Sequence, residues 1–563
     1  NTAFASKALS MLDEFKNSSL GPEEVEELSQ SLEGSPVGKK LSDLSLIYSA
    51  YEAMLERGRH DPRDDLMRAL SLVQDTDFFL GSVVILDAFF SFPKAELALI
   101  QCALQKAEEV SVSLCCDSLT GTGARAFDVC RDTARRLMRL AKENGCTVAP
   151  PVLLTEVYRY EKATLGHVAA QCAYVPGERT GQNDGSVLVA QAGDRYEEVR
   201  FAAATIRKLV REEGLRYRDI VVIARSLEDY QASLEDVFAR YDIPYFMDQR
   251  IQVQYMPLMN LVTSLVDIAR GNFSTGDVMR HLKSYLLEVD SDSIYDLEGY
   301  CYTWNIDRNG WLQEWKQNPS GMQTRMTEED GEKLVALEEL RKTIVGPLSA
   351  FREKTRGSLD GEVFARAIFA YLEETGIPGR VEMLAKSYER AGEKNRADEL
   401  YACWEVLMGI LEQFSAVLGG RQLSLARLGE MLSLSIAGSD LGHIPQTLDQ
   451  VTIGAADRIR PSGPKVTLIL GANEGVFPLS APPQSLISQP ERLLINRLGE
   501  QVFETLEDRF YKEFTYIYMA VTSPSQKLVI SYPTMDVEGK PLFPAPFVQQ
   551  ICTMVEGLAP LDI

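Results

Sequence analysis

A short apolar run, VTLIL at residues 466–470, constrains the fold of this chain more than any other stretch. It is uninterrupted by charge and is closed by Gly471, which is the pattern of a strand buried on both faces of a parallel sheet. Residues 472–475, Ala-Asn-Glu-Gly, then turn the chain. In parallel α/β sheets ligands bind at the carboxyl ends of the strands, so Asn473 and Glu474 are candidate ligand contacts. Turn formation alone also accounts for both residues.

The length and composition indicate a folded protein of several domains. The chain has 563 residues, 45% of them hydrophobic and 25% charged, so three or four units are expected and disorder of the whole chain is not. The net charge of -23 has the wrong sign for a protein that simply coats DNA. It leaves room for a local basic groove, because the position of charge matters more than its sum.

The sequence contains no signal of a membrane or metal protein. No apolar stretch reaches the ~18 to 20 residues that a membrane helix needs, and the N-terminus lacks a secretory signal. The nine cysteines show no zinc-type spacing, which predicts no metal site and a cytoplasmic protein with reduced thiols. Since the chain opens on Asn1 rather than Met, we expect it to be the middle part of a longer protein.

Alternating strand and helix patterns divide the chain into segments. The sequence predicts an α/β protein with two parallel-sheet domains and helical insertions, because strands alternate with helices except in a long helical stretch. The polar, glycine-containing residues 176–185 are the best linker candidate. The predicted limits are 1–77 for a helical accessory region, 78–180 for the rest of the first sheet domain, 186–255 for the first part of the second, 256–441 for a helical insertion and 442–563 for the return part of the second.

An acidic residue follows the first predicted buried strand, which ends at residue 86. In ATP-driven motors an Asp at a strand end holds Mg²⁺, and an adjoining Glu orients the attacking water. Asp87 stands in the first of these positions and Ala88, which cannot orient water, in the second. As an alternative, Asp87 caps a helix that begins near Pro93 and binds no metal. A second buried strand is expected at residues 110–116.

Two sets of residues are candidates for contact with nucleic acid. Arg131, Arg135 and Arg139 are four residues apart and therefore share one face of a predicted helix. Trp304 belongs to a group of aromatic residues in the helical stretch, where exposed rings can stack on single-stranded bases. The alternatives are a solvated arginine face paired with neighbouring acids, and a tryptophan in the core.

A third basic candidate follows a predicted strand. Arg225 ends the apolar run of DIVVIARS (residues 219–226), and its forked, permanently charged side chain suits a phosphate. An ion pair with Asp219 or Glu228 is the alternative.

Three stretches together resemble superfamily 1 helicases of the UvrD type. Residues 451–478, VTIGAADRIRPSGPKVTLILGANEGVFP, are similar to motif V of those helicases. DIVVIARS, with the helix and IPYF that follow, resembles the motif IV region, and residues 518–532, YMAVTSPSQKLVISY, resemble motif VI. Together with IPQTLDQV before the first stretch, the pattern is similar to the AddB family, the B subunits of bacterial AddAB helicase-nucleases.

The resemblance implies two RecA-like domains with an eroded nucleotide site. Arg225 matches the motif IV arginine that reaches the γ-phosphate, but Ser523 stands where motif VI has its finger arginine. No phosphate loop is found in the sequence, so Asp87, Arg225 and Ser523 are interpreted as remnants, with no catalytic residue among them. The motif V residues that grip DNA are also replaced, which leaves Arg458, Arg460 and Asn473 as candidates for DNA contact.

The resemblance also implies partners and cofactors. It implies a motor partner, AddA, action on duplex ends and single-stranded DNA in double-strand-break repair, and inspection of the strand for the Chi signal. ATP with Mg²⁺ and an iron-sulfur cluster are implied for full-length members of the family, whereas no cofactor is expected within these residues. The alternatives are an active helicase whose phosphate loop lies outside this sequence and a scaffold for AddA that binds no DNA.

Overall fold

The computed structural model describes residues 2–55, 61–119, 123–174, 179, 182–248, 250–322, 325–442, 449–460, 463–480, 485–498 and 502–563. They form two compact units, the first made of residues 3–248 and 445–563 and the second of residues 249–444. The sequence predicted a helical insertion at 256–441, inside the limits of the second unit. Of the predicted linker 176–185, residues 176–178, 180 and 181 lie outside the described residues.

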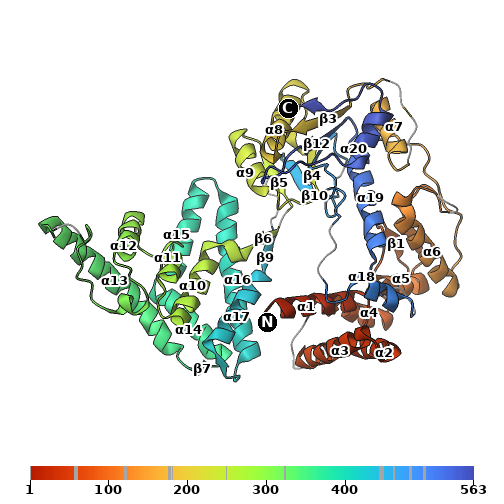
Figure 1. Ribbon diagram of the computed structural model, residues 1–563. Helices are drawn as coiled ribbons and strands as arrows, with labels where there is room; N and C mark the ends of the chain where they lie inside the picture. The colour runs from red at the N-terminus through yellow and green to blue at the C-terminus, as the bar shows by residue number, and fades with distance from the viewer. Residues whose placement is uncertain are drawn as a thin grey trace. The chain divides into compact units, whose positions relative to one another are not determined.

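Seven parallel strands form the main sheet of the first unit, in the order β13-β3-β12-β11-β4-β10-β5 (Figure 1). The strands are β3 (Val187–Ala192), β4 (Ile220–Ala224), β5 (Tyr245–Met247), β10 (Val451–Ala455), β11 (Val466–Leu470), β12 (Lys527–Pro533) and β13 (Leu561–Asp562). The predicted strand at 466–470 is confirmed as β11, which is buried throughout and pairs with β4 and β12. The α/β class with a large parallel sheet is thus confirmed.

Helices cover both faces of this sheet. Alternate residues of a strand point to opposite faces, so Val221 and Ile223 of β4 join one core and Ile220 and Val222 join the other. The first core is completed by α7 (Ala163–Gln171), α19 (Leu506–Thr522) and α20 (Pro546–Met554), and the second by α8 (Arg195–Glu212) and α9 (Gln231–Arg240) (Figure 1). η3 (Tyr217–Asp219) leads into β4.

A buried carboxylate ties the carboxyl end of β11 to α8. Glu198 accepts hydrogen bonds from the backbone N–H of Gly471 at 2.9 Å, from Ser531 Oγ at 2.6 Å and from Tyr230 Oη at 2.6 Å. Burial raises the pKa of Glu198, although these donors act in the opposite direction. Gly471 has a φ of 66°, so the turn at the end of β11 uses the left-handed conformation that glycine adopts most readily.

A small parallel sheet of two strands, β1 (Val83–Leu86) and β2 (Glu109–Val112), stands where the first sheet domain was predicted. It is accompanied by η1 (Pro62–Asp64), α4 (Asp65–Gln74), α5 (Lys94–Lys106), η2 (Arg125–Phe127) and α6 (Asp128–Glu143). The prediction of buried strands is wrong here, because Val83 and Ile85 are 58% and 71% exposed. With two described strands, this sheet does not establish a second RecA-like domain.

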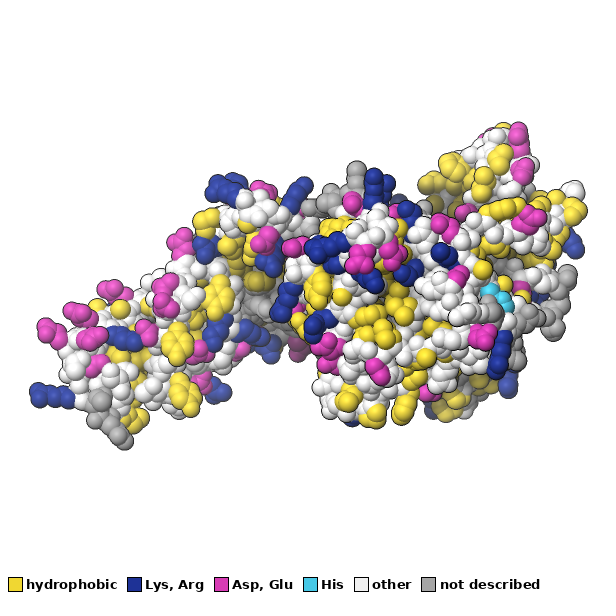
Figure 2. All heavy atoms as spheres, turned by 90° about the horizontal axis from the view of Figure 1, so that it is seen from above, with side chains coloured by type: hydrophobic (Ala, Val, Ile, Leu, Met, Phe, Trp, Pro, Cys, Tyr) yellow, Lys and Arg dark blue, Asp and Glu magenta, His cyan; other side chains and the backbone are white. Residues whose placement is uncertain are grey.

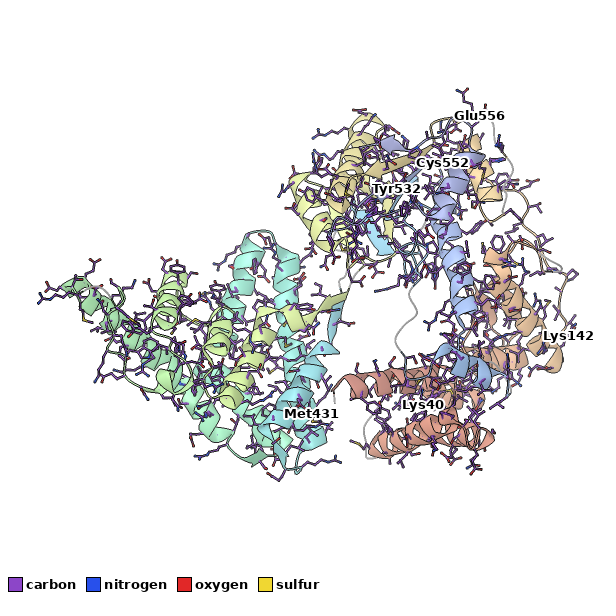
Figure 3. The ribbon with its side chains drawn as sticks, in the orientation of Figure 1. Lys40, Lys142, Met431, Tyr532, Cys552 and Glu556 are labelled. Carbon is purple, nitrogen blue, oxygen red and sulfur yellow. The ribbon has the colours of Figure 1, made fainter. Side chains whose placement is uncertain are left out.

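The N-terminal residues form helices, as their spacing predicted: α1 (Thr2–Asn17), α2 (Pro22–Ser31) and α3 (Pro36–Leu55). Phe15 and Leu41 pack in one apolar cluster with Ile495 of α18 (Gln489–Asn496). At the edge of this contact Lys40 Nζ donates to Glu491 of α18 at 2.8 Å (Figure 3). The N-terminal helices therefore belong to the first unit.

The second unit is a helical body with one large apolar core. Its elements are β6 (Arg250–Gln252), η4 (Val253–Tyr255), α10 (Pro257–Gly271), α11 (Thr275–Leu282), α12 (Ser291–Thr303), η5 (Arg308–Leu312), α13 (Glu328–Lys354), β7 (Ser358–Leu359), α14 (Gly361–Glu374), α15 (Ile377–Arg390), α16 (Lys394–Leu418), β8 (Leu423–Ser424), α17 (Leu425–Ala437) and β9 (Asp440–Gly442). β6 and β9 pair antiparallel, so the chain enters and leaves this unit side by side. Among the described residues of both units, no helix is long and apolar enough to cross a membrane.

Candidate functional site

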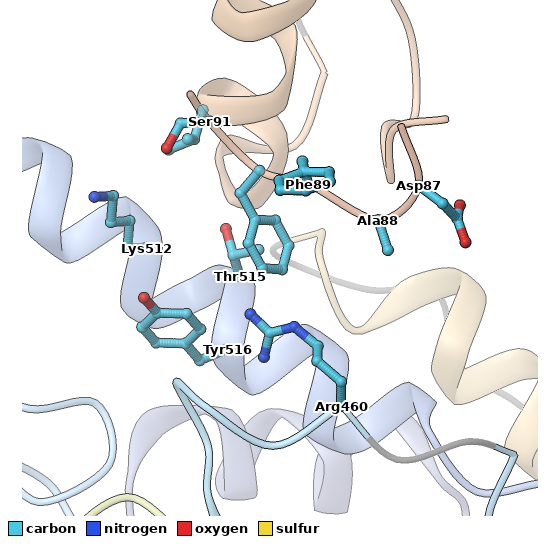
Figure 4. Close-up of a pocket in the computed structure, with 10 residues that line it drawn as sticks. Asp87, Ala88, Phe89, Ser91, Arg460, Lys512, Thr515 and Tyr516 are labelled. Atoms are coloured by element: carbon cyan, nitrogen blue, oxygen red, sulfur yellow. The ribbon is translucent and has the colours of Figure 1, made fainter. Parts of the chain in front are cut away.

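A pocket of about 510 Å³ lies at the carboxyl end of β1 (Figure 4). One wall is the segment that leads from β1 to α5, and the opposite wall is α19 with the residues that follow β10. Its lining residues are Asp87, Ala88, Phe89, Phe90, Ser91, Val129, Arg460, Lys512, Thr515 and Tyr516. The pocket thus combines one carboxylate, two cations and three aromatic rings.

Asp87 lies in this pocket, directly after β1. Its carboxylate accepts a hydrogen bond from Ser113 Oγ, and Ser113 follows β2. The N-terminal cap of α5 is Pro93, so the alternative interpretation of Asp87 as a helix cap is wrong. Ala88 adopts a φ of 59° beside it and offers no group that could orient water. In Figure 4, Asp87 and Lys512 stand at opposite sides of the pocket.

Aromatic and basic side chains form the rest of the wall. The guanidinium of Arg460 lies 5.1 Å from the centre of the Phe90 ring, a cation–π distance. Phe90 also meets Tyr516 of α19 edge to face, with ring centres 6.5 Å apart. Lys512 Nζ pairs with Glu504 at 2.5 Å. The contacts of Phe90 with Arg460 and Tyr516 join the segment after β1 to elements of the large sheet.

Arg225 lies behind the pocket wall, at the carboxyl end of β4. Its Nε and Nη2 donate to the Glu513 carboxylate at 2.7 to 3.0 Å, and Nη1 lies 3.3 Å from Asp457. Burial is the largest single effect and opposes the charge of Arg225, but hydrogen bonding to Glu513 together with the negative charges of Glu513 and Asp457 outweighs it, so the pKa of Arg225 is raised. The partners are Glu513 and Asp457 rather than the predicted Asp219 or Glu228. The guanidinium is therefore fully engaged within the protein.

Ser523 does not line the pocket. It follows α19, is 9% exposed, shares a hydrogen bond of 2.7 Å with Thr467 of β11 and donates to the Ala520 carbonyl at 2.9 Å. Of the three predicted nucleotide-site residues, Asp87 lines the cavity, Arg225 is engaged behind its wall and Ser523 is buried against β11. The structure therefore does not bring the three residues together in this pocket.

The predicted arginine stripe of α6 divides into buried and exposed members. Arg131 is 2% exposed and pairs with Asp117 and Asp128 at 2.5 Å each, so it cannot reach a phosphate and this prediction is wrong. Arg135 and Arg139 are exposed, and Arg135 pairs with Asp132 at 2.5 Å. The stripe therefore presents Arg135 and Arg139, but not Arg131, to solvent.

The remaining candidates for DNA contact also differ in access. Asn473 is 1% exposed and donates to the carbonyls of Pro533 and Phe543, so its predicted DNA contact is wrong. Trp304 is half-buried against the helical core and donates to the Asn318 carbonyl at 2.9 Å, which contradicts a free stacking platform. Arg458 is exposed and pairs with Asp248 at 3.1 Å.

Sequence reasoning missed the part of the pocket that comes from α19. Lys512, Thr515 and Tyr516 share one face of that helix, a spacing that is equally typical of an ordinary surface helix. Phe89 and Phe90 stand two and three residues after Asp87, so their closeness to that carboxylate in the sequence was a signal that could have found them. Arg460 was predicted as a DNA contact and is brought beside Phe90 instead.

The chemistry of a metal cofactor is not supported by the residues that the structure describes. Among them, no group of three or more His, Cys, Asp or Glu side chains could hold a metal ion. The described cysteines do not fit the iron-sulfur cluster that the resemblance implies for full-length relatives, because all nine are free thiols outside any such group. Burial raises the pKa of several, including Cys130 to about 12.

Comparison with known proteins identifies the family. Residues 1–169 match the family model described as "ADDB, N-terminal". Proteins named as the B subunit of an ATP-dependent helicase/deoxyribonuclease are 30% identical in Acetivibrio thermocellus over 551 residues, and 28% identical in Clostridium acetobutylicum over 559 residues. These matches cover 96% and 98% of this chain but 48% of each relative, so the chain spans about half the length of the curated relatives it matches. Similarity that runs through nearly all of its residues shows that the chain belongs to the AddB family.

Proposed function

We propose that this chain is the helicase-like part of the B subunit in an ATP-dependent helicase/deoxyribonuclease that processes DNA double-strand breaks, and that it holds single-stranded DNA without hydrolysing ATP. The family match and the names of the relatives support the subunit role. The observation that supports the absence of ATP hydrolysis is the composition of the pocket at Asp87. The pocket keeps one carboxylate and two cations, but its described lining residues include no second carboxylate or glutamine that could orient the attacking water.

Hydrolysis of ATP needs a group that orients water and cations that neutralise the transferred phosphoryl group. Ala88 stands where the first group is needed, and Arg225 is held by Glu513 and Asp457. Removing Arg225 from Glu513 would leave a largely buried carboxylate without its partner, which is costly. The side chains of the site therefore support a structural role rather than the hydrolysis of ATP.

The test is ATP hydrolysis by the purified protein, with and without single-stranded DNA. We expect no turnover above that of a buffer control and no difference between the wild type and Asp87→Ala. A second candidate function, an active motor, is favoured by the presence of Asp87, Arg460 and Lys512 in one pocket. DNA-stimulated hydrolysis that Asp87→Ala abolishes would establish that motor and refute the proposal.

Single-stranded DNA would be held mainly through phosphate contacts. The exposed side of α6 carries Arg135, Arg136, Arg139 and Lys142, the last of which is labelled in Figure 3. This cationic row supports local binding despite the net charge of -23. Basic and acidic side chains are interspersed on the face shown in Figure 2, so the row rather than the whole surface is the proposed contact.

Binding is measured by fluorescence anisotropy of a labelled single strand at several salt concentrations. Replacing Arg136 and Arg139 by glutamine is expected to weaken binding and to reduce the slope of log K against log salt by up to about 1.5. Exchange of the exposed Lys316 and Lys386 of the second unit for glutamine is the matched control. If the wild type binds no DNA at low salt, the scaffold alternative replaces this part of the proposal.

Two further elements of the proposal concern the complete assembly. We propose a motor subunit as partner and inspection of the strand for Chi as the role of the eroded domain, since the relatives are named as one subunit of a helicase/deoxyribonuclease. We also propose that these 563 residues have no nuclease activity by themselves. The lack of a clustered metal site in the described part of the chain supports this, and Mg²⁺-dependent digestion of DNA by pure protein would overturn it.

A further inference from the structure

One face of α12, in the second unit, presents two tyrosine rings to solvent. Tyr295 and Tyr302 are 77% and 89% exposed. They stand seven residues apart, so they lie on the same side of the helix and about 10 Å from each other along its axis. Gly299 lies between them, and a Cβ added there would meet no atom within 4 Å. The two rings therefore flank an open strip of the helix surface.

Neighbouring elements hold this helix in place without covering its rings. α12 packs against α11 and α13, and its inner side belongs to the apolar core of the unit (Figure 1). Glu298 accepts a hydrogen bond of 2.6 Å from Lys283, at the end of α11, and Asp296 accepts one of 2.7 Å from Lys333 of α13. The helix that carries the rings is thus tied to both of its neighbours.

A further apolar side chain lies near the C-terminal end of α12. Met322 is 74% exposed. The segment before it follows the end of the helix, because Trp304 Nε1 donates to the Asn318 carbonyl at 2.9 Å. A Cβ on Gly321 would likewise lie 4.0 Å from Thr303 Cγ2. Tyrosine and methionine are enriched at protein interfaces. The tyrosine face of α12 consists of Tyr295, Gly299, Tyr302 and Met322.

The surroundings of the tyrosine face are acidic. Residues 288–339, which contain α12 and the start of α13, include thirteen Asp or Glu against four Lys or Arg. Asp292 is three residues before Tyr295 and shares its side of the helix. Glu329 is one turn before Lys333, on the side of α13 that meets α12. Asp292 and Glu329 have no basic partner in the described part of the chain. Carboxylates beside aromatic rings attract cations and repel phosphates.

We propose that the tyrosine face binds a basic segment of another protein, whose arginine or lysine side chains stack on the two rings. A cation within about 6 Å of a ring centre is attracted by the ring face, and Asp292 and Glu329 would pair with the same charges at the rim. Met322 offers an apolar contact for the stems of such side chains. Nucleic acid does not match this surface, because its phosphates would meet carboxylates that have no basic partner.

Fluorescence anisotropy of a labelled peptide tests the proposal on the 563-residue protein. The probe has about 16 residues, with arginine and leucine at helical spacing, and its counterpart has glutamate in place of each arginine. Tyr295→Ala combined with Tyr302→Ala is expected to weaken binding of the arginine peptide at least about tenfold. Tyr295→Phe combined with Tyr302→Phe keeps the ring faces and should stay within about twofold of the wild type. The glutamate peptide is expected not to bind.

Two further variants separate the tyrosine face from the rest of the surface. Tyr255→Ala is the matched control, because Tyr255 of η4 is another tyrosine of the second unit and is 74% exposed. It is expected to change the affinity by less than about twofold. Asp292→Lys keeps both rings and is expected to weaken binding about threefold through charge repulsion. Thermal unfolding of each variant should match the wild type, because all of these side chains are exposed.

Three outcomes would overturn the proposal. Equal affinity of the wild type and the double alanine variant would show that the peptide is drawn to negative charge elsewhere on the chain. A lack of binding at low salt would show that the face does not recognise cations. A dimer of the protein that the double alanine variant dissociates would show that a second copy is the occupant. None of these measurements involves ATP or DNA, so the proposed function is tested separately.

Discussion

Acid is predicted to unfold the helical unit through one buried histidine. His281 of α11 is fully buried, with Nε2 2.7 Å from Tyr371 Oη and Nδ1 3.1 Å from the Leu261 carbonyl. These partners suit a neutral ring, in which Nδ1–H donates to the carbonyl and Nε2 accepts from the tyrosine. Burial lowers the pKa of His281 from 6.5 to about 4.

The sign and size of the effect follow from this pKa. The unfolded chain binds a proton at His281 as the pH falls below about 6.5, whereas the folded chain resists until about 4, so stability is full above pH 6.5 and declines between these values. The loss is about 1.4 kcal/mol at pH 5.5 and approaches about 3 kcal/mol once the folded state is also protonated. That is a large fraction of the stability of an ordinary domain.

Tryptophan fluorescence isolates this unit, because all four tryptophans of the chain, Trp304, Trp311, Trp315 and Trp404, lie within residues 249–444. Urea unfolding is followed at about pH 7.5, 6.5, 5.5 and 4.5 for the wild type and His281→Gln. The variant is expected to be less stable at about pH 7.5 but to lose little between there and about pH 5.5. Equal losses of stability in the two proteins between about pH 7.5 and 5.5 would refute the assignment to His281. Carboxylates do not explain a loss in this interval: the pKa of Glu338, for example, is lowered mainly by its hydrogen bond with Arg341, so its protonation reduces stability only at lower pH.

Two further substitutions test the first unit. Gly471→Ala is expected to cost more than about 2 kcal/mol in thermal unfolding, since φ is 66° and the added Cβ would lie 2.8 Å from Tyr230 Oη, whereas Gly463→Ala, with φ 63° and open space, should cost only the ~1 kcal/mol of backbone strain. Equal losses of stability in the two variants would show that the contact between the added Cβ and Tyr230 Oη has no effect. Arg225→Ala should destabilise by about 3 kcal/mol by leaving Glu513 unpaired, and Glu513→Gln should cost less; the reverse order in urea midpoints would contradict this account of the pair.

The sequence predicted the positions of strands better than it predicted whether other elements bury them. VTLIL was recognised as β11 because a continuous β-rich run closed by glycine leaves few alternatives. The same reasoning correctly placed a strand before Asp87 but wrongly predicted that the strand is buried. An apolar composition shows that a segment can be buried, but it does not show whether other elements cover it. β2 likewise ends at Val112 rather than at residue 116.

The candidate site was predictable only where its residues follow a strand. Asp87 could be placed because the end of a parallel strand is a defined position. Tyr516 and Lys512 could not, because their place in the pocket depends on how α19 packs between two sheets. Arg131 and Asn473 were misjudged because a polar residue at a helix face or strand end can equally serve the interior, as their buried hydrogen bonds show.

The order of the main sheet has a consequence for synthesis of the protein. β4 lies between β10 and β11, so a strand made early is flanked on both sides by strands made after the whole of residues 249–444. Such long-range pairing is slow and leaves apolar edges bare while the ribosome is still at work. The nascent chain must therefore keep β3, β4 and β5 from aggregating until β10, β11 and β12 have been made, which predicts a strong dependence on chaperones during translation.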